Sequence, residues 1–146
     1  MSGGSRLPVH LTGRVQPCPV DRERVRNLLA RSEKDLKTAG IIRSADPEAA
    51  YSMVYESMLH AGLAFLAACG FRADVAAKHK TVVDFAEHRL GADHKELVEY
   101  YDRMRRKRHQ FIYEPGPYRC TDHELTGGIK MANKLLALIQ KEIVSK

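Results

Sequence analysis

The stretch DPEAAYSMVYESMLHAGLAFLAACG, residues 46–70, decides the fold. Asp46 is suited to cap a helix, and Pro47 fits the first helical position that follows it. From Met53 to Cys69 the residues are apolar on nearly every side of a helix, which is the pattern of a buried helix. Gly70 ends this pattern. We therefore expect a central helix that other helices cover.

Four further segments show helical periodicity, with apolar residues three and four positions apart and charged residues on the opposite face. Asp21 is expected to cap the first of them. Asp93 with Glu96, and Thr121 with Glu124, have the spacing of capping boxes. We find almost no strand pattern. The expected helices run from about Asp21 to Ala39, Asp74 to Leu90, Asp93 to Tyr113 and Thr121 to Ile143.

The chain is therefore predicted to be all-α, a single-domain, up-and-down antiparallel bundle of about five helices. The bundle is expected to span residues 20–146 and to follow a flexible N-terminal arm, residues 1–19, which lacks a signal-peptide core. Gly40 and Gly91 are expected just beyond the first and third helices, and Val75 on the inward side of the third.

Composition and charge exclude several classes of protein. The 146 residues carry 24 Lys and Arg against 18 Asp and Glu, and five of these basic residues lie within residues 103–108. The longest apolar stretch, Met58–Phe71, is too short to cross a bilayer. Three widely spaced cysteines without a CxxC pair favour reduced thiols and a cytoplasmic protein. The short apolar stretch means that we expect no membrane association. Because metal-ligand spacings and nucleotide-binding glycine motifs are missing from the sequence, we also expect no metal and no cofactor.

An arginine interrupts the apolar pattern of the fourth helix. On a helical wheel Leu97, Tyr101, Met104 and Phe111 form one apolar face, and Arg108 falls in the middle of it. In one interpretation Arg108 extends past the edge of the core or pairs with a buried carboxylate. In the other, an unpaired Arg108 lies in a groove between helices or at a two-fold interface, where its guanidinium would bind a phosphate oxygen.

If Arg108 lies in a phosphate-binding groove, the basic residues beside it would contribute to binding. Arg105 and Lys107 would form a positive rim that attracts polyanions. Arg103 and Arg106 point away from the apolar face on the wheel. His79 of the third helix is either a core histidine or a ligand of the same groove. The candidates for binding nucleotide or nucleic acid are Arg103, Arg105, Lys107, Arg108 and His79.

The segment YDRMRRKRHQFIYE, residues 101–114, resembles the signature helix of HEPN-domain proteins. It follows an alanine-rich central helix and precedes a long amphipathic one, so the resemblance covers roughly residues 20–145. It implies a helical bundle that dimerises through this helix, which carries an Arg-x4–6-His motif in the family. In ribonuclease members two such motifs meet and cut RNA without metal. Many members pair with a minimal nucleotidyltransferase as toxin and antitoxin, and others bind nucleotide or nucleic acid without catalysis.

On this chain the resemblance places Arg108 at the motif arginine and His109 at the polar residue after it. Tyr113 stands where a ribonuclease has histidine, and with a pKa of about 10 tyrosine is a poor general base at neutral pH. An alternative alignment pairs Arg103 with His109. The candidate catalytic residues are Arg108, His109 and Tyr113.

Three hypotheses on function follow. The leading one is a homodimeric HEPN-type protein whose basic helix binds nucleotide or RNA, with a nucleotidyltransferase partner in a toxin–antitoxin-like module. The second is a metal-independent endoribonuclease toxin that uses His109 with either Arg108 or Arg103. The third is a non-catalytic structural or scaffolding dimer.

Overall fold

Helix α2 (Pro47–Ala68) lies at the centre of the bundle, as the sequence predicts. In the computed structural model, which describes residues 7–114, 116, 117 and 119–145, the Asp46 carboxylate accepts from the Ala49 amide at 3.0 Å. Helices α1 (Arg22–Ile42), α3 (Lys78–Leu90), α4 (Lys95–Tyr113) and α5 (Asp122–Val144) all pack against α2.

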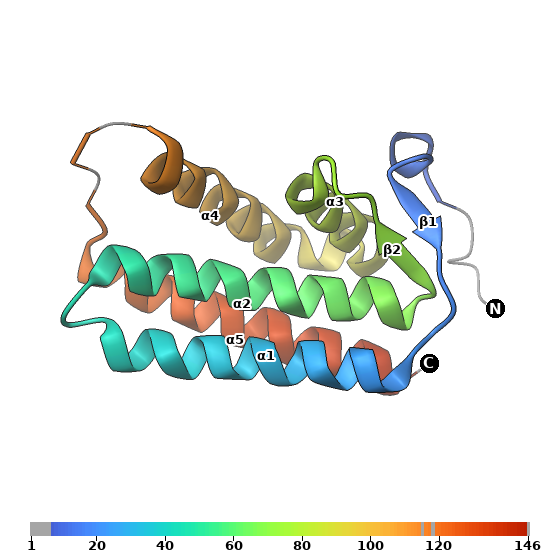
Figure 1. Ribbon diagram of the computed structural model, residues 1–146, viewed down its shortest axis with the longest axis horizontal. Coiled ribbons are helices and arrows are strands. Elements are labelled where there is room, and N and C mark those ends of the chain that lie inside the picture. Colours follow the sequence, from blue (N-terminus) through green and yellow to red (C-terminus); the bar gives the residue numbers. More distant parts are fainter. Residues whose placement is uncertain (1–6, 115, 118, 146) are drawn as a thin grey trace.

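The four long helices run alternately in opposite directions along the molecule, whereas the shorter α3 lies near the end of α2 (Figure 1). Helices α1 and α5 cover one side of α2, while α3 and α4 cover the other (Figure 1). This arrangement confirms an all-α antiparallel bundle in a single compact domain.

Two capping predictions are confirmed and one is wrong. The Asp21 carboxylate accepts from the amides of Glu23 and Arg24 at the start of α1, and Thr121 with Glu124 forms a complete capping box on α5. Asp93 caps nothing, because it lies within a short 3₁₀ turn (Ala92–His94) that precedes α4. The tighter turn takes up the residues that the expected capping box needs.

Two helix boundaries also differ from the prediction. Helix α1 continues through Gly40 to Ile42. Helix α3 begins at Lys78 instead of Asp74, after Ala77 in the left-handed conformation (φ 57°). Val75 therefore lies before the helix and is exposed rather than inward.

A small antiparallel sheet of strands β1 (Val15–Pro17) and β2 (Phe71–Ala73) was not predicted. Its strands are only three residues long and pair across the whole of α1 and α2, so no local alternation signals them. Leu11 and Val15 are buried in the core, and residues 7–19 therefore do not form the flexible arm expected from sequence. The first six residues of that arm lie outside the described residues.

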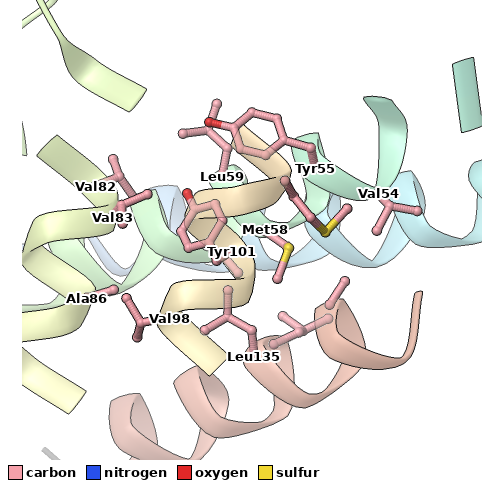
Figure 2. Packing of buried hydrophobic residues seen from close by; sticks show 14 of the residues in the cluster. Val54, Tyr55, Met58, Leu59, Val82, Val83, Ala86, Val98, Tyr101 and Leu135 are labelled. Carbon is pink, nitrogen blue, oxygen red and sulfur yellow. The ribbon is translucent and has the colours of Figure 1, made fainter. Parts of the chain in front are cut away.

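The core is built around aromatic rings of α2 and α4. Tyr55 and Tyr101 are fully buried with ring centroids 5.9 Å apart, and both hydroxyl groups point toward α3 (Figure 2). Gly62 allows α3 to approach α2 closely, because a Cβ at this position would lie 2.3 Å from a methyl group of Val82. At Gly128 of α5 the space is less restricted, because a Cβ would lie 3.1 Å from the terminal methyl group of the flexible Met104 side chain of α4.

Candidate functional site

Arg108 is held by a carboxylate of the central helix. Its Nη2 donates to Oε1 of Glu56 at 3.4 Å, and its guanidinium lies 5.5 Å from the centroid of the Tyr55 ring. The Arg108 side chain is 20% exposed, so it sits at the edge of the core. The expectation of an unpaired arginine is therefore wrong, and the structure matches the interpretation in which a carboxylate holds it.

Most of the other cations of residues 103–108 are also paired. Asp102, which directly precedes this segment, accepts from Nε of Arg105 at 2.8 Å and from Nη1 of Arg106 at 2.6 Å. Lys107 pairs with Glu124 of α5. Burial by itself would raise the pKa of Asp102, but the hydrogen bond and charge of Arg105 hold this pKa below its ordinary value. Carboxylates from three helices therefore pair with four of the five cations and offset part of the positive charge.

Arg103 is exposed and lies over the Tyr100 ring, 5.3 Å from its centroid. Together with Arg106 it borders a cleft of about 230 Å³ between α3 and α4, which also contains Lys80 and three acidic side chains of the two helices besides Asp102. The helical wheel places both arginines away from the apolar face. A wheel describes one helix alone, so it does not show that α3 lines the other side of the cleft.

The ring of Tyr55 connects His79 to Arg108. The Tyr55 hydroxyl lies 2.7 Å from Nδ1 of His79, and the two rings stack with centroids 5.7 Å apart. Arg108 contacts the same Tyr55 ring. The structure thus brings together two of the predicted binding residues, although they come from different helices, α3 and α4.

The protonation states within this cluster follow from burial. Burial lowers the pKa of His79, and the positive charge of Arg108 lowers it further, so the imidazole is neutral. Burial raises the pKa of Tyr55 well above its ordinary value, with Arg108 partly opposing the shift, so the phenol keeps its proton. The hydrogen bond between the Tyr55 hydroxyl and Nδ1 therefore joins two neutral groups, each of which is able to donate, and Nε2 of His79 is the ring nitrogen that Tyr55 does not use.

Several buried polar atoms of this cluster have no hydrogen-bond partner among the described residues. They are Nε of Arg108, Oε2 of Glu56 and the hydroxyl of Tyr101. A buried polar group left unpaired costs about 1–3 kcal/mol, and such groups are few in native proteins. The long Arg108–Glu56 pair therefore leaves one donor and one acceptor unused, which is the opposite of a saturated structural ion pair.

The predicted catalytic residues do not assemble within one chain. Arg108 points toward α2, whereas His109 and Tyr113 are exposed and contact each other with ring centroids 4.6 Å apart. Neighbouring residues of a helix point about 100° apart, so His109 is directed away from the cluster around Arg108. Arg103 with His109, the alternative pair, is not brought into contact in the described part of the chain either.

Two residues of the site were missed from sequence, Tyr55 and Glu56. A signal for Glu56 exists, because it is the one acidic residue in the apolar stretch 53–69. A carboxylate on a nearly buried helix needs a cation, and an arginine in the middle of another apolar face needs an anion. Pairing Glu56, the acidic residue on an apolar helix, with Arg108, the basic residue on an apolar face, would have predicted this ion pair. Tyr55 has no comparable signal, since aromatic residues are ordinary in a core.

Comparisons with known proteins add no relative. No family model matches the chain, and no curated protein matches it in sequence. In the described part of the chain, none of the helices has the length and apolar character needed to cross a membrane. No group of three or more His, Cys, Asp or Glu side chains within the described ranges is arranged to hold a metal ion.

Proposed function

We propose that this chain is a HEPN-type protein that binds nucleotide or RNA through the cluster of Tyr55, His79 and Arg108 and the adjoining C-terminal half of α4. The order and lengths of the helices are compatible with that family. The observation that carries the proposal is that the guanidinium of Arg108 and the imidazole of His79 both contact one tyrosine ring, that of Tyr55.

These two groups suit a phosphate and its neighbouring base. The guanidinium of Arg108 keeps donors beyond the one used by Glu56, and a phosphate oxygen accepts charge-assisted hydrogen bonds from such donors. Nε2 of the neutral His79 ring, which Tyr55 does not use, is a second hydrogen-bonding atom for the ligand. The exposed rings of His109 and Tyr113 follow on the same helix and provide surfaces on which a base can stack.

The same proposal includes a cytoplasmic homodimer and a nucleotidyltransferase partner. Ile112 and Tyr113 are exposed at the end of α4, where 66% of the Tyr113 surface is accessible. A second copy of α4 would cover these side chains. Sedimentation velocity at tens of micromolar tests this part: a dimer that Ile112→Asp converts to monomer supports it, and a wild-type monomer contradicts it.

Binding is the function to test first. Fluorescence anisotropy with a single-stranded RNA should show an affinity loss of about 1–3 kcal/mol for Arg108→Ala, the expected cost of a charge-assisted contact. Arg106→Ala is the matched control, because Arg106 is on the same helix, exposed and engaged with Asp102. Equal losses for the two variants would mean that binding reflects overall charge, and the proposal would be wrong.

Salt dependence sharpens the same test. If all five cations met phosphates, the log–log slope would be about −3.5, since each neutralised phosphate of a single strand contributes about −0.7. Four of the cations already have carboxylate partners. We therefore expect a slope of about −0.7 to −1.4, equivalent to one or two phosphates. A slope that does not differ from zero would exclude phosphate contacts.

The endoribonuclease hypothesis receives less support from this geometry. The predicted catalytic residues His109 and Tyr113 lie apart from the cluster around Arg108, and one ring nitrogen of His79 is already engaged with Tyr55. Incubating RNA in EDTA with wild type, Arg108→Ala, His109→Ala and His79→Gln separates the hypotheses. Cleavage that Arg108→Ala abolishes would establish the enzyme, and absence of both binding and cleavage would favour the scaffolding role.

A further inference from the structure

A second polar cluster lies between α1 and α2, and a buried carboxylate forms its centre. Asp35 is 1% exposed; its Oδ1 accepts from Nε of Arg31 at 3.0 Å and its Oδ2 accepts from Nδ1 of His60 at 2.7 Å. Both oxygens are in use, so one carboxylate fixes the direction of a guanidinium and of an imidazole at the same time.

The two side chains held by Asp35 face one cavity. Arg31 and His60 line a cavity of about 330 Å³ together with Asn27 and Arg24. Within the described chain, Nη1 and Nη2 of Arg31 have no partner and Arg24 has no ion pair. Three donor groups, two of them cationic, therefore converge on the cavity from α1.

His60 adds an acceptor to these donors. A carboxylate can only accept, so Nδ1 of His60 carries the shared proton, and in the neutral ring Nε2 keeps its lone pair. The His60 side chain is 26% exposed and lines the cavity. A hydroxyl group is a natural donor to Nε2.

Two acidic residues also border the cavity. Asp21 already accepts from the amides of Glu23 and Arg24, because it caps α1. The Glu23 side chain is exposed at the rim and lacks an ion pair within the described residues. With Asp35, three carboxylates therefore lie near the cations Arg24 and Arg31. An anion at this place would be held by directed hydrogen bonds from Arg24, Arg31 and Asn27 and not by a net positive charge.

We propose that this cavity binds a small phosphate monoester that also carries a hydroxyl group, of the sugar-phosphate kind. Arg31 and Arg24 bind the phosphate oxygens, and Nε2 of His60 accepts from the hydroxyl. Asp35 is a positioning residue, since it touches both ligand-binding side chains but not the ligand. This site shares no residue with the Arg108 cluster and does not depend on the function proposed for that cluster.

Calorimetric titration with ribose 5-phosphate tests the proposal, with inorganic phosphate, ribose and AMP as the other arms. We expect ribose 5-phosphate to bind more tightly than inorganic phosphate, and ribose not to bind. AMP binding at least as tightly to the Arg108→Ala variant, in which the other proposed nucleotide site is impaired, would identify the phosphate source as a nucleotide, and weaker AMP binding to this variant would identify a free sugar phosphate. Failure of ribose 5-phosphate to bind would overturn the proposal.

Variants connect the binding to these residues. Arg31→Met should weaken ribose 5-phosphate binding about tenfold or more, the loss expected for charge-assisted hydrogen bonds. Arg26→Met is the matched control, because this arginine of α1 lines a different, apolar groove. Equal weakening by the two variants would show that only overall charge matters, and the proposal would fail.

Two further variants separate ligand contact from structural support. His60→Leu should remove the preference for ribose 5-phosphate over inorganic phosphate while phosphate binding persists, an outcome that loss of stability alone would not produce. A preserved preference would overturn the role of His60. Arg108→Ala should leave ribose 5-phosphate binding unchanged, so failure here and failure of the proposed RNA site are distinguishable. Circular dichroism of each variant confirms that the fold is kept.

Discussion

Two segments of this molecule are rich in arginine: residues 22–31 of α1 and residues 103–108 of α4. They differ in how many of their cations form ion pairs. In α4 the cations meet Asp102, Glu56 and Glu124, so four of five are paired. In α1, Arg22, Arg24 and Arg26 have no ion pair among the described residues, and Arg31 pairs with the buried Asp35.

The comparison shows that the density of basic residues along a sequence does not measure the charge available to a ligand. The α4 segment is the more basic one in sequence, yet carboxylates from α2, α4 and α5 surround it. The α1 segment contains its own Glu23 and attracts less attention in sequence, yet most of its guanidinium groups remain accessible. Charge must therefore be counted with its partners in space.

The largest expected effect concerns Asp35, the buried carboxylate that pairs with Arg31 of the α1 segment. Asp35→Ala removes two charge-assisted hydrogen bonds from a fully buried site, and we expect a loss of about 2–3 kcal/mol in the free energy of unfolding. Urea denaturation measures it. Glu33→Ala, an exposed neighbour on α1, should cost less than about 0.5 kcal/mol. Similar losses for both would mean that the burial of Asp35 and its two hydrogen bonds contribute no more stability than an exposed carboxylate of the same helix.

A smaller effect is expected for the pair at the edge of the α4 segment. The Arg108–Glu56 contact is long at 3.4 Å and partly exposed, so its coupling free energy should be about 0.5–1 kcal/mol. A double-mutant cycle with Arg108→Met and Glu56→Gln, followed by urea denaturation, gives this value. A coupling above about 2 kcal/mol would show a structural ion pair that is not free to exchange for a ligand.

The smallest expected effect is the dependence of stability on pH through His79. Burial and the charge of Arg108 lower the pKa of His79, so the folded state binds this proton less readily than the unfolded state. Its stabilising contribution is thus complete above the ordinary histidine pKa of 6.5 and is lost as the pH falls through the lowered value. Lys78, Arg105 and Glu56 also act on this ring.

Thermal unfolding of wild type and His79→Gln across this pH range tests the effect. The glutamine variant keeps a hydrogen-bonding group but no titration, so its unfolding temperature should fall less steeply between neutral and acidic pH. Parallel curves for the two proteins would show that His79 does not titrate differently in the folded state.

The sequence by itself determined the elements whose signals are local. The cap at Asp46 with Pro47 and the capping box of Thr121 with Glu124 depend on residues within one helical turn, so both were predicted correctly. The apolar faces of the helices were equally local, and together they specify an antiparallel helical bundle. Gly91 ended α3 as expected for the same reason.

Only the tertiary structure decided which groups meet. Strands β1 and β2 pair across two long helices, and no short-range pattern specifies that contact. The partners of Arg108 and Asp35 come from the central helix, and their choice depends on the rotation and spacing of whole helices. A displacement of about one ångström is enough to form or break a hydrogen bond or ion pair. Apolar periodicity specifies only which side of a helix is buried. The fold was therefore accessible from sequence, and the partners within both candidate sites were not.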